Sequence, residues 1–470
     1  MAWSLQAPYQ FLRSGSEVEQ VTGIDVAMFR AAAAHAGLSV IFSQLPWEEA
    51  LERVEEGSID VVLGAFPTAA RAEYAYFSDA IRFATESIFL LRDRMPHARS
   101  LEELLDALAR DGLRIAAIED FELGDRFNRF RNDPEHAHLV VPTADLAQSL
   151  HLLERGEVDG FVMDRLAGYN ALSERHMWSL QSHPVPIHEE DIVALFSRAS
   201  VDSALVEYFN WGLQQVYQDD QQRVIERRFV LPVMLDMALY GAWFEIILIV
   251  GMVAFSISAV VIARTGDYGL FGAVVLASLP ALGGGVVRDV LILREPYIFA
   301  FPVYVYIVLG TLVGGFLFNR VLARLRGRSL LFFDFVNLVL LMRQRIQPKL
   351  LMGIFDAAGI AAFTVVAVTI AVEFGREPLW LWGPVLAALT ATGGAIIRDM
   401  IRKDSGNEIL HHAFYAETVI IWSLPLSLYL QYFGLSADPQ VIFWALMTTM
   451  CGIFATRIAF VVYGWSGPRY

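Results

Sequence analysis

Long apolar runs fill the carboxyl-terminal half of this 470-residue chain, and none interrupts its amino-terminal half. A helix that crosses a bilayer needs about 20 predominantly apolar residues. Seven runs meet that need, at about 240–263, 268–290, 300–320, 351–373, 379–400, 412–433 and 440–463. A shorter apolar stretch at 330–342 suits an interfacial helix or an extension of the fourth segment. The sequence therefore predicts an all-α membrane domain of seven spans at residues 236–470.

The charge of the chain changes at the same place. Residues 1–236 hold 20 Arg, no Lys and 38 Asp or Glu, a net charge of −18, whereas residues 237–470 hold 16 basic and 13 acidic residues, a net charge of +3. An acidic first half disfavours nucleic acid as a partner, because phosphate binding needs clustered Lys and Arg.

The residue inventory excludes several kinds of site. The single cysteine, Cys451, excludes an internal disulfide framework and a Cys-x-x-Cys metal site. Neither Lys349 nor Lys403 follows the glycine-rich run of an ATP-binding loop. We therefore expect no metal, no cofactor and no enzyme activity, and nothing in the chain implies an ATPase subunit as a partner.

Basic residues in the loops predict the orientation, since loops rich in Arg and Lys stay in the cytoplasm. With residues inside the apolar runs set aside, one side of the membrane holds 11 basic residues and the other holds two, Arg294 and Arg376. Seven spans then place the carboxyl terminus in the cytoplasm and the first domain in the periplasm of a bacterium with two membranes. No signal peptide is visible at Met1, so we expect a mature or trimmed start.

The membrane half contains an internal repeat. Gly283-Gly284-Gly285-Val-Val-Arg288-Asp289 recurs as Gly393-Gly394-Ala395-Ile-Ile-Arg398-Asp399, and Phe255 to Ala263 matches Phe363 to Ala371 at five of nine positions. The copies lie three spans apart, which predicts an inverted second copy and a pseudo-two-fold axis in the membrane plane. Repeat one covers about 240–320, repeat two covers about 350–433, and the last span at about 440–463 is left over.

The repeated motif predicts a functional site. Three small residues in a row weaken a helix, and an Arg near the bilayer centre costs about 2.5–3.5 kcal/mol unless it faces water, a carboxylate or a lipid headgroup. Broken helices in matching positions indicate permeation or binding near the midplane. The candidate residues are Gly283, Gly284, Gly285, Arg288, Asp289, Asp356, Gly393, Gly394, Arg398 and Asp399. The alternatives are packing glycines, structural ion pairs at helix ends and, for Asp356, a capping or snorkelling carboxylate.

This doubled motif, with Asp356-Ala-Ala-Gly359 in a three-plus-three-plus-one arrangement, resembles the bacterial glycine-transporter-like family, which is related to the trimeric intracellular cation (TRIC) channels. The match covers about residues 240–465. The resemblance implies a homotrimer with one pore per protomer and kinked second and fifth helices. The second copy departs mildly, with Gly-Gly-Ala for Gly-Gly-Gly. Family membership leaves transport and channel function open.

The first 235 residues alternate between strand and helix patterns. A helical pattern opens at Gly23-Ile24-Asp25-Val26 and ends at Gly37, and a strand, a helix and a second strand follow up to Leu63. A β-α-β-α-β order is typical of a parallel sheet. We therefore expect an α/β domain.

Two motifs in this half resemble the family-three solute-binding proteins, which deliver polar amino acids to bacterial importers. The first motif consists of Gly64, Thr68 and Arg71 and ends with Phe77-Ser78-Asp79, and the second motif runs from Leu153 to Asp164. The resemblance implies a two-lobed periplasmic-binding-protein fold at 1–235, with its final Asp pointing into the cleft. The lobes are about 1–92 with 187–235 and about 95–185, joined by two crossing strands.

The chemistry of these residues suits an α-amino acid. Arg71 offers a bidentate fork for a carboxylate, backbone N–H groups after Gly64 add to it, and Asp164 offers a negative charge for the ammonium. Tyr9 and Trp47 provide aromatic faces for the side chain, although Trp47 fits core packing equally well. The candidate ligand-binding residues are therefore Tyr9, Trp47, Gly64, Thr68, Arg71 and Asp164.

The loop that opens the second lobe departs from the family pattern. Carboxylates at Glu119, Asp120 and Glu122 repel an anionic ligand group and leave room for a cationic or altered ligand. The leading hypothesis is a membrane transport protein for a small amino-acid-like solute. The alternatives are a solute-gated cation channel and a membrane sensor, and the sensor is disfavoured because only about seven residues follow the last span.

Overall fold

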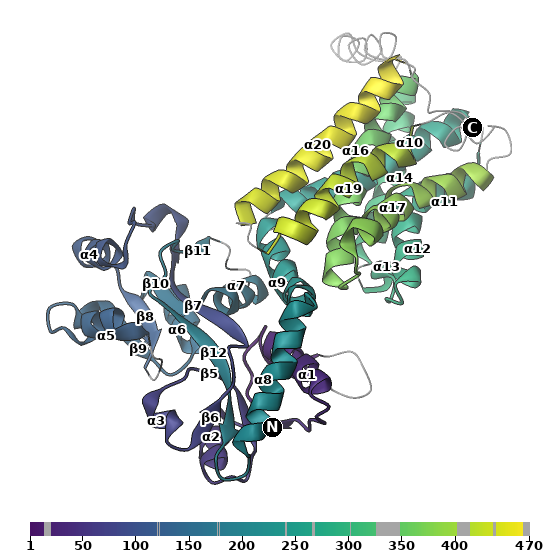
Figure 1. The fold of residues 1–470 in the computed structure, drawn as a ribbon. Helices are drawn as coiled ribbons and strands as arrows, with labels where there is room; N and C mark the ends of the chain where they lie inside the picture. The colour runs from purple at the N-terminus through teal and green to yellow at the C-terminus, as the bar shows by residue number, and fades with distance from the viewer. Residues whose placement is uncertain are drawn as a thin grey trace. The chain divides into compact units, whose positions relative to one another are not determined.

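The computed structural model describes residues 1–13, 20–119, 121, 123–175, 177, 179–239, 242–265, 268–300, 302–325, 348–401, 414–435 and 439–463. The chain divides into two compact units, Met1–Val233 and Met234–Tyr470. Figure 1 shows that the first unit mixes strands with helices and that the second unit is helical.

One lobe of the first unit is built around a short parallel sheet. β1 lies between β4 and β5 and runs parallel to both. Apolar side chains of β1, α2 and β5 form its core, with Val54 and Val62 almost fully buried. The elements are β1 (Ala2–Trp3), β2 (Phe11–Arg13), β3 (Gln20–Thr22), α1 (Ile24–His35), β4 (Ser43–Gln44), α2 (Trp47–Glu55), β5 (Val61–Ala65), α3 (Ala69–Ala72), β6 (Ala75–Phe77) and α8 (Ser203–Gln218).

The other lobe has a second parallel sheet, in which β8 lies between β9 and β10. Its core packs Leu104 and Phe127 of the covering helices against the sheet. The elements are α4 (Leu101–Asp111), β8 (Ile115–Ile118), α5 (Gly124–Asn132), β9 (Val140–Thr143), α6 (Leu146–Glu154), β10 (Gly160–Asp164), α7 (Arg165–Glu174) and β11 (Leu180–Ser182), with short 3-10 turns at Arg92–Arg94 and Ala137–Leu139.

Two ten-residue strands connect the lobes, β7 (Arg82–Leu91) and β12 (His188–Ser197). They pair antiparallel with each other, with Glu86 opposite His188 and Arg82 opposite Ile192. Beyond that shared stretch, β12 continues beside β5 and β6, whereas β7 continues beside β10 and β11. The prediction of a periplasmic-binding-protein-like α/β fold is confirmed.

The second unit is helical throughout its described residues. Helices from the two repeat copies pack together, α10 against α16 and α12 against α17, and α16 also contacts α20. α9 (Gln221–Leu239) begins in the first unit and ends in the second. The elements that follow are α10 (Ala242–Thr265), α11 (Leu270–Ser278), the π-helical turn η3 (Leu279–Gly283), α12 (Gly284–Leu291), α13 (Tyr297–Ala300), α14 (Val303–Leu325), α16 (Pro348–Glu373), α17 (Leu379–Ile401), α19 (Ala416–Phe433) and α20 (Pro439–Tyr463).

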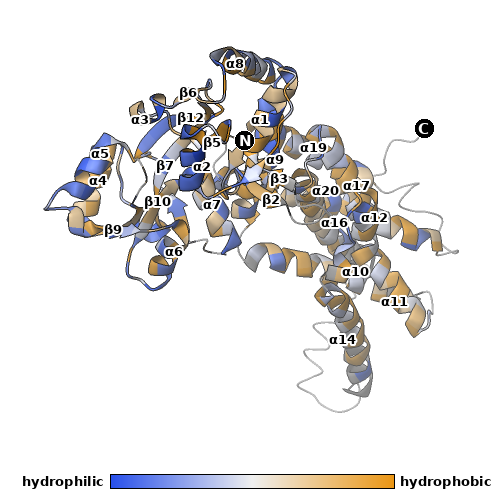
Figure 2. Cartoon of the chain, turned by 90° about the horizontal axis from the view of Figure 1, so that it is seen from below, coloured by the Kyte–Doolittle hydropathy of each residue, from blue (hydrophilic) through white to orange (hydrophobic). Residues whose placement is uncertain are grey.

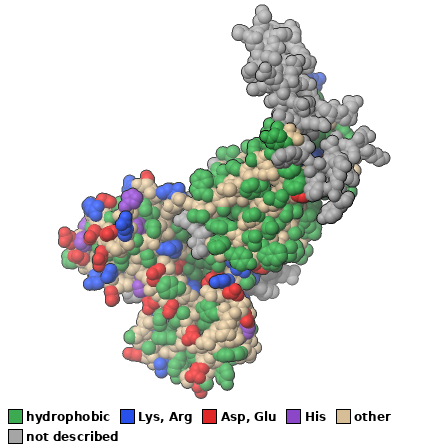
Figure 3. Space-filling view, turned by 45° about the horizontal axis from the view of Figure 1, so that its top comes forward, with side chains coloured by type: hydrophobic (Ala, Val, Ile, Leu, Met, Phe, Trp, Pro, Cys, Tyr) green, Lys and Arg blue, Asp and Glu red, His purple; other side chains and the backbone are tan. Residues whose placement is uncertain are grey.

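Apolar residues dominate these helices and cover the face of the unit seen in Figure 3, whereas the first unit carries both acidic and basic side chains (Figures 2 and 3). Among the described residues, five helical stretches are long and apolar enough to cross a membrane, and Val303–Leu317 is a shorter apolar helix. The five are Trp243–Val260, Leu270–Leu291, Gly353–Glu373, Leu379–Ile401 and Pro439–Tyr463. Seven spans and their inverted repeat stay predictions, and the stretch at 330–342 lies outside the described residues.

The two copies of the glycine motif differ in helix geometry. In the first copy the π-helical turn η3 interrupts the helix just before Gly284, because Pro280 lacks the N–H that would continue the α-helical pattern. In the second copy Thr390 takes the place of Pro280, and α17 continues through Gly393 and Gly394 without interruption. The helix is therefore irregular at the first motif and regular at the second, and the expected kinks stay predictions.

Candidate functional site

Arg71 is held in place by its own lobe. Thr68 caps the short helix α3 by accepting a hydrogen bond from the Arg71 backbone N–H at 3.3 Å. Arg71 Nη1 donates to the carbonyl oxygen of Phe66 at 2.8 Å, and the guanidinium lies 5.6 Å from the centre of the Trp47 ring. Trp47 packs against the lobe core as well, and its role as an aromatic face for a ligand stays a prediction. Arg71 itself remains half-buried, and its guanidinium also interacts with the side chain of Tyr74.

Tyr9 and Asp164 bind each other in the interior of the unit, and each is only 4% exposed. Asp164 ends β10 and caps α7, where its Oδ1 accepts from the backbone N–H groups of Leu166 at 3.1 Å and Ala167 at 3.0 Å. The Tyr9 hydroxyl donates to the same oxygen. In this structure the hydroxyl of Tyr9 therefore contacts Asp164, the carboxylate that was predicted to bind the ligand ammonium.

Two further charged residues, Arg82 and Asp25, belong to this group, and sequence reasoning missed both. Arg82, the first residue of β7, donates from Nε to Asp25 Oδ1 at 2.8 Å, and its Nη1 lies 4.0 Å from Asp164 Oδ2. Its guanidinium also stacks 3.4 Å from the centre of the Tyr9 ring, a cation–π contact. Burial works against the charge of Arg82, but Asp25, and after it Tyr9 and Asp164, raise the pKa of the guanidinium.

Gly64 makes room for this group. Its φ of +83° is in the region that favours glycine, and a Cβ there would lie 2.6 Å from Gln10 Nε2. Gln10 Nε2 in turn donates to Asp25 Oδ2 at 3.4 Å. Gly64 therefore belongs to the Tyr9–Asp164 group, and its predicted contribution of N–H groups to a ligand stays a prediction.

Glu86 adds a third buried carboxyl group. It lies four residues after Arg82 on β7 and is 4% exposed, and its Oε2 has no hydrogen-bond partner within the described part of the chain. Burial, and after it Asp164, raises the pKa of Glu86 to about 8, while Arg82 opposes the shift. Burial likewise raises the pKa of Asp25 against the pull of Arg82. Three carboxyl groups around one guanidinium make this region receptive to a cationic ligand group.

The predicted ligand residues thus fall into two groups, which we call the Arg71 group (Trp47, Phe66, Thr68 and Arg71) and the Asp164 group (Tyr9, Gln10, Asp25, Gly64, Arg82, Glu86 and Asp164). Within the described residues, no hydrogen bond or ion pair joins them. Of the acidic loop, Asp120 and Glu122 lie outside the described residues, and Glu119 is exposed at the end of β8. The position of Arg82, three residues after the Phe77-Ser78-Asp79 motif at the start of a crossing strand, was the signal available in the sequence.

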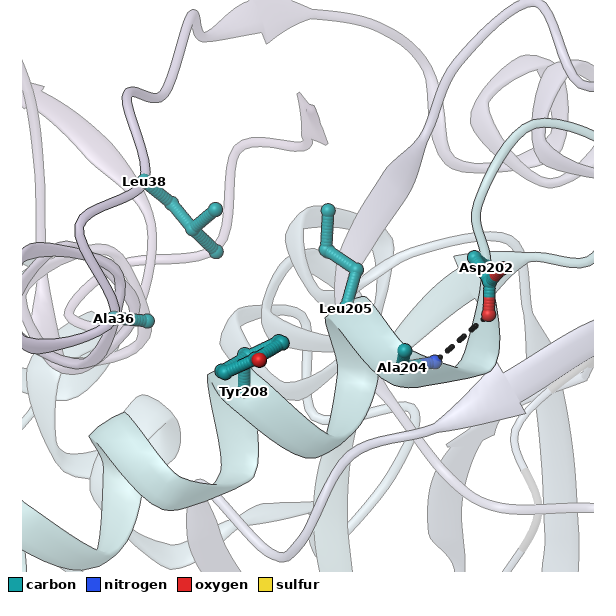
Figure 4. Close-up of a pocket in the computed structure, with 6 residues that line it drawn as sticks. All are labelled: Ala36, Leu38, Asp202, Ala204, Leu205 and Tyr208. Carbon is teal, nitrogen blue, oxygen red and sulfur yellow. Dashed lines mark hydrogen bonds between the residues drawn. The ribbon is translucent and has the colours of Figure 1, made fainter.

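A surface hollow of about 410 Å³ lies elsewhere on this unit, between the end of α1 and the start of α8. Figure 4 shows Leu38 facing Leu205 and Tyr208 across it, with the Asp202 side chain accepting from the Ala204 N–H. None of the predicted ligand residues lines this hollow.

In the membrane unit, the first Arg–Asp pair is closed on itself. Arg288 Nε and Nη2 donate to Asp289 Oδ1 at 2.9 and 2.7 Å, and Asp289 Oδ2 accepts from the Tyr297 N–H at 3.0 Å. Both side chains are nearly inaccessible, at 3% and 0%. This pair has the features of a structural ion pair at a helix end.

The second Arg–Asp pair has different surroundings. Arg398 Nε donates to Asp399 Oδ1 at 2.8 Å, but Arg398 Nη1 is buried without a partner in the described residues. Asp356 of α16 faces both members of this pair and Arg457 of α20. The structure therefore brings Asp356 to the second motif and adds Arg457, which the sequence analysis set aside.

The glycines of the two motifs pack against the opposite copy. A Cβ on Gly284 would lie 2.1 Å from the carbonyl oxygen of Thr390, and a Cβ on Gly394 would lie 2.0 Å from that of Leu279. A Cβ on Gly285 would instead meet the Tyr297 ring at 2.5 Å. These glycines allow the two helices to cross at close range.

Comparison with known proteins assigns each half to a family. Residues 3–232 match the bacterial extracellular solute-binding proteins, family 3, and residues 245–320 and 353–430 match the family described as glycine transporter.

Individual relatives agree with the second assignment. The chain is 27% identical over 232 residues to the UPF0126 membrane protein YvgT of Bacillus subtilis, across 48% of this chain and 96% of the relative. It is 28% identical over 174 residues to the UPF0126 inner membrane protein YadS of Escherichia coli, across 37% of this chain and 72% of the relative.

Among solved structures, a histidine kinase sensor domain with similarity to periplasmic binding proteins has a TM-score of 0.40 at 22% identity, covering 49% of this chain and 94% of its own. A substrate-binding protein of an amino acid ABC transporter has a TM-score of 0.39 at 15% identity, covering 48% and 97%. The family matches confirm the two resemblances found in the sequence: residues 3–232 are similar to the family-three extracellular solute-binding proteins, and the membrane half is similar to the family described as glycine transporter.

Proposed function

We propose that this protein is a membrane transport protein in which the first domain captures a small amino-acid-like solute and the membrane domain moves that solute across the membrane. The observation that carries the proposal is the presence of a solute-binding domain and a transporter-family domain in one chain. The solute-binding domain is periplasmic and the carboxyl terminus is cytoplasmic in this proposal, as the distribution of loop charges favours.

The two residue groups of the first domain support recognition of a zwitterion. Arg71, aligned by Thr68 and Phe66, binds the carboxylate as a planar fork. The solute ammonium takes the donor position on Asp164 that the Tyr9 hydroxyl fills in this structure. Because Asp164 lies on one lobe and Arg71 on the other, a solute that contacts both favours the closed arrangement of the lobes.

Contacts between equivalent residues support the inverted repeat within a TRIC-like membrane domain. Phe255 stacks on its counterpart Phe363, with ring centres 5.6 Å apart. Gly284 and Gly394 occupy equivalent positions in the two motifs. Gly284 approaches the carbonyl oxygen of Thr390 in the second copy, and Gly394 approaches the carbonyl oxygen of Leu279 in the first. Reciprocal contact between equivalent positions is what a two-fold axis produces. The proposal includes a homotrimer in contact with membrane lipid, with one pathway per protomer.

The test is a flux measurement on the complete protein in proteoliposomes. A thermal-shift screen first identifies the amino acid that stabilises the chain, and the same labelled amino acid is then offered for uptake. Arg71→Ala should weaken solute binding by about 30-fold or more, since loss of one partner of a hydrogen-bonded charge pair costs about 2–5 kcal/mol. Arg53→Ala is the matched control, because Arg53 is half-exposed and pairs with Glu49 on the surface of α2.

The alternative function gives a different result in the same vesicles. A solute-gated cation channel produces an ion current that depends on the solute, without accumulation of labelled solute. Uptake that survives Arg71→Ala with unchanged affinity would remove the first domain from the transport cycle.

A further inference from the structure

A polar cluster lies among the apolar helices of the membrane domain, around the second Arg–Asp pair. Its members come from four helices and from the residue that precedes α19. The four helical members are Ser258 of α10, Asp356 of α16, Arg398 of α17 and Arg457 of α20, and the residue that precedes α19 is Tyr415.

Each member of the cluster has a buried polar atom without a hydrogen-bond partner in the described residues. These atoms are Ser258 Oγ, Asp356 Oδ1, Arg398 Nη1, Tyr415 Oη and Arg457 Nε. Ser258 and Asp356 lie close enough to interact with each other, whereas nothing in the described residues satisfies Arg398 Nη1, Tyr415 Oη and Arg457 Nε. Buried polar groups in folded proteins are nearly always satisfied, so atoms of this kind gathered in one place indicate an occupant.

The members are otherwise firmly positioned. Arg457 Nη1 donates to the carbonyl oxygen of Phe414 at 3.1 Å, and its guanidinium stacks 4.5 Å from the centre of the Tyr415 ring. Arg398 is fixed by Asp399 at 2.8 Å. The polar atoms without partners therefore belong to side chains whose orientation is already fixed by other contacts. A preformed binding site has this arrangement.

The charges of the cluster define the occupant. Arg398 and Asp399 neutralise each other, which leaves one guanidinium, Arg457, and one carboxylate, Asp356. A cation alone satisfies Asp356 Oδ1 but leaves both arginine N–H groups unpaired, and an anion alone does the reverse. A ligand with a carboxylate and an ammonium satisfies all three, and the hydroxyl groups of Ser258 and Tyr415 complete its contacts.

The surroundings of the first Arg–Asp pair differ: Arg294 lies 4.0 Å from Glu373, and Arg376 donates to the Ile292 carbonyl oxygen at 2.8 Å. Alignment of Phe255 with Phe363 places Leu248 opposite Asp356 and Val366 opposite Ser258. The Arg288–Asp289 pair is correspondingly closed by Tyr297. The cluster is therefore specific to the second copy and the last span, and no requirement of helix packing in the repeat explains it.

We propose that this cluster binds the zwitterion of a small α-amino acid within the membrane domain, through the two guanidinium groups and Asp356. The proposal rests on the proposed transport function and names the place where the membrane domain holds the solute after the first domain has captured it.

A cysteine substitution tests the cluster directly. Cys451 is the single cysteine of the chain and is exposed, so Cys451→Ser gives a cysteine-free background. Ser258→Cys then places a thiol in the cluster with little change of volume. Ser256→Cys is the matched control: Ser256 is equally buried on the same helix, but its hydroxyl donates to the Met252 carbonyl oxygen at 2.8 Å.

The complete protein in proteoliposomes is treated with methanethiosulfonate ethylammonium, with and without glycine, L-alanine, L-glutamate or L-arginine. We expect labelling of the Ser258→Cys chain and none of the Ser256→Cys chain. An amino acid at about ten times its dissociation constant should slow the labelling about tenfold. Potassium acetate and methylammonium chloride, which each supply one of the two charged groups, should not slow it.

Asp356→Asn in the Ser258→Cys background should leave the thiol reactive and abolish protection by the amino acids. An unreactive thiol at 258, reaction that no amino acid slows, or equal protection by acetate or methylammonium would each overturn the proposal. Protection in vesicles that show no uptake would contradict the transport function and leave the site standing, so the two failures are distinguishable.

Discussion

The close crossing of the two glycine motifs makes a sharp prediction about Gly394. An alanine Cβ at 394 would lie 2.0 Å from the carbonyl oxygen of Leu279, whereas an ordinary contact begins at 3.4 Å. The obstacle is backbone, which cannot rotate away, so the helices must separate by about 1.4 Å. Overpacking of this kind costs about 1–3 kcal/mol.

The neighbouring glycine is the matched control. At Gly393 the nearest atom to an added Cβ is Gly284 Cα at 4.0 Å, so Gly393→Ala introduces no clash. In a helix interior this substitution stabilises by about 0.5–1 kcal/mol, because alanine loses less backbone entropy than glycine. The two variants should therefore differ by about 2–4 kcal/mol although their sequences differ only in which of two adjacent glycines is replaced.

The measurement is thermal unfolding of the complete protein in detergent, followed by size-exclusion chromatography. A difference of about 2–4 kcal/mol corresponds to roughly 5–15 °C in Tm for a unit of this size. Gly284→Ala, with a Cβ 2.1 Å from the Thr390 carbonyl oxygen, should behave as Gly394→Ala does, and Gly283→Ala as Gly393→Ala does. Equal melting temperatures for the 393 and 394 variants would refute the close crossing.

Two further predictions concern the first domain. Glu86→Gln should reduce the pH dependence of the stability of this domain. The folded-state pKa of Glu86, about 8, lies above the ordinary value of 4.5, so between these two pH values the folded state holds a proton that the unfolded state releases. The stability of the domain therefore falls as the pH rises from 4.5 to 8. The wild-type chain should lose about 2–3 kcal/mol between pH 5 and pH 7 through this group, as measured by urea unfolding, and an identical slope in the variant would exclude Glu86 as the cause. Thr68→Ala should lower the free energy of unfolding by about 0.5–2 kcal/mol, because it removes the cap of α3, and it should weaken solute binding, because the Arg71 backbone loses its hydrogen-bond acceptor. Calorimetry on the variant checks both effects. An unchanged affinity would show that the position of Arg71 does not depend on this cap.

The architecture of the first domain was readable from the sequence because local signals and long-range pairing agree there. Gly64, Thr68 and Arg71 form a contiguous motif, and the turn they specify is the one observed. Arg82 and Asp25 were missed for a physical reason: they are 57 positions apart in the chain and meet only because α1 packs beside the start of β7. A sequence shows each of them as an ordinary charged residue.

In the membrane domain, the sequence predicted the helices but treated the two glycine motifs as equivalent. Their backbones differ because Pro280 removes one N–H that Thr390 retains, and the result is a π-helical turn in one copy and a continuous helix in the other. The helix break thus depends on a residue three positions before the glycines, and the glycines themselves mainly permit the crossing.

The asymmetry extends to the charged residues, and it bears on how such a repeat works. In the proposed repeat, the two copies supply a symmetric scaffold, with equivalent phenylalanines and glycines in contact where the copies meet. A solute with two unlike charged groups needs an asymmetric site. The chain supplies that asymmetry with Asp356 opposite Leu248 and with Arg457 from the unpaired last span, while Arg288 and Asp289 keep each other neutral in the first copy. In the proposed site α20 is therefore a contributor, and its removal should abolish zwitterion binding even where the other helices still assemble.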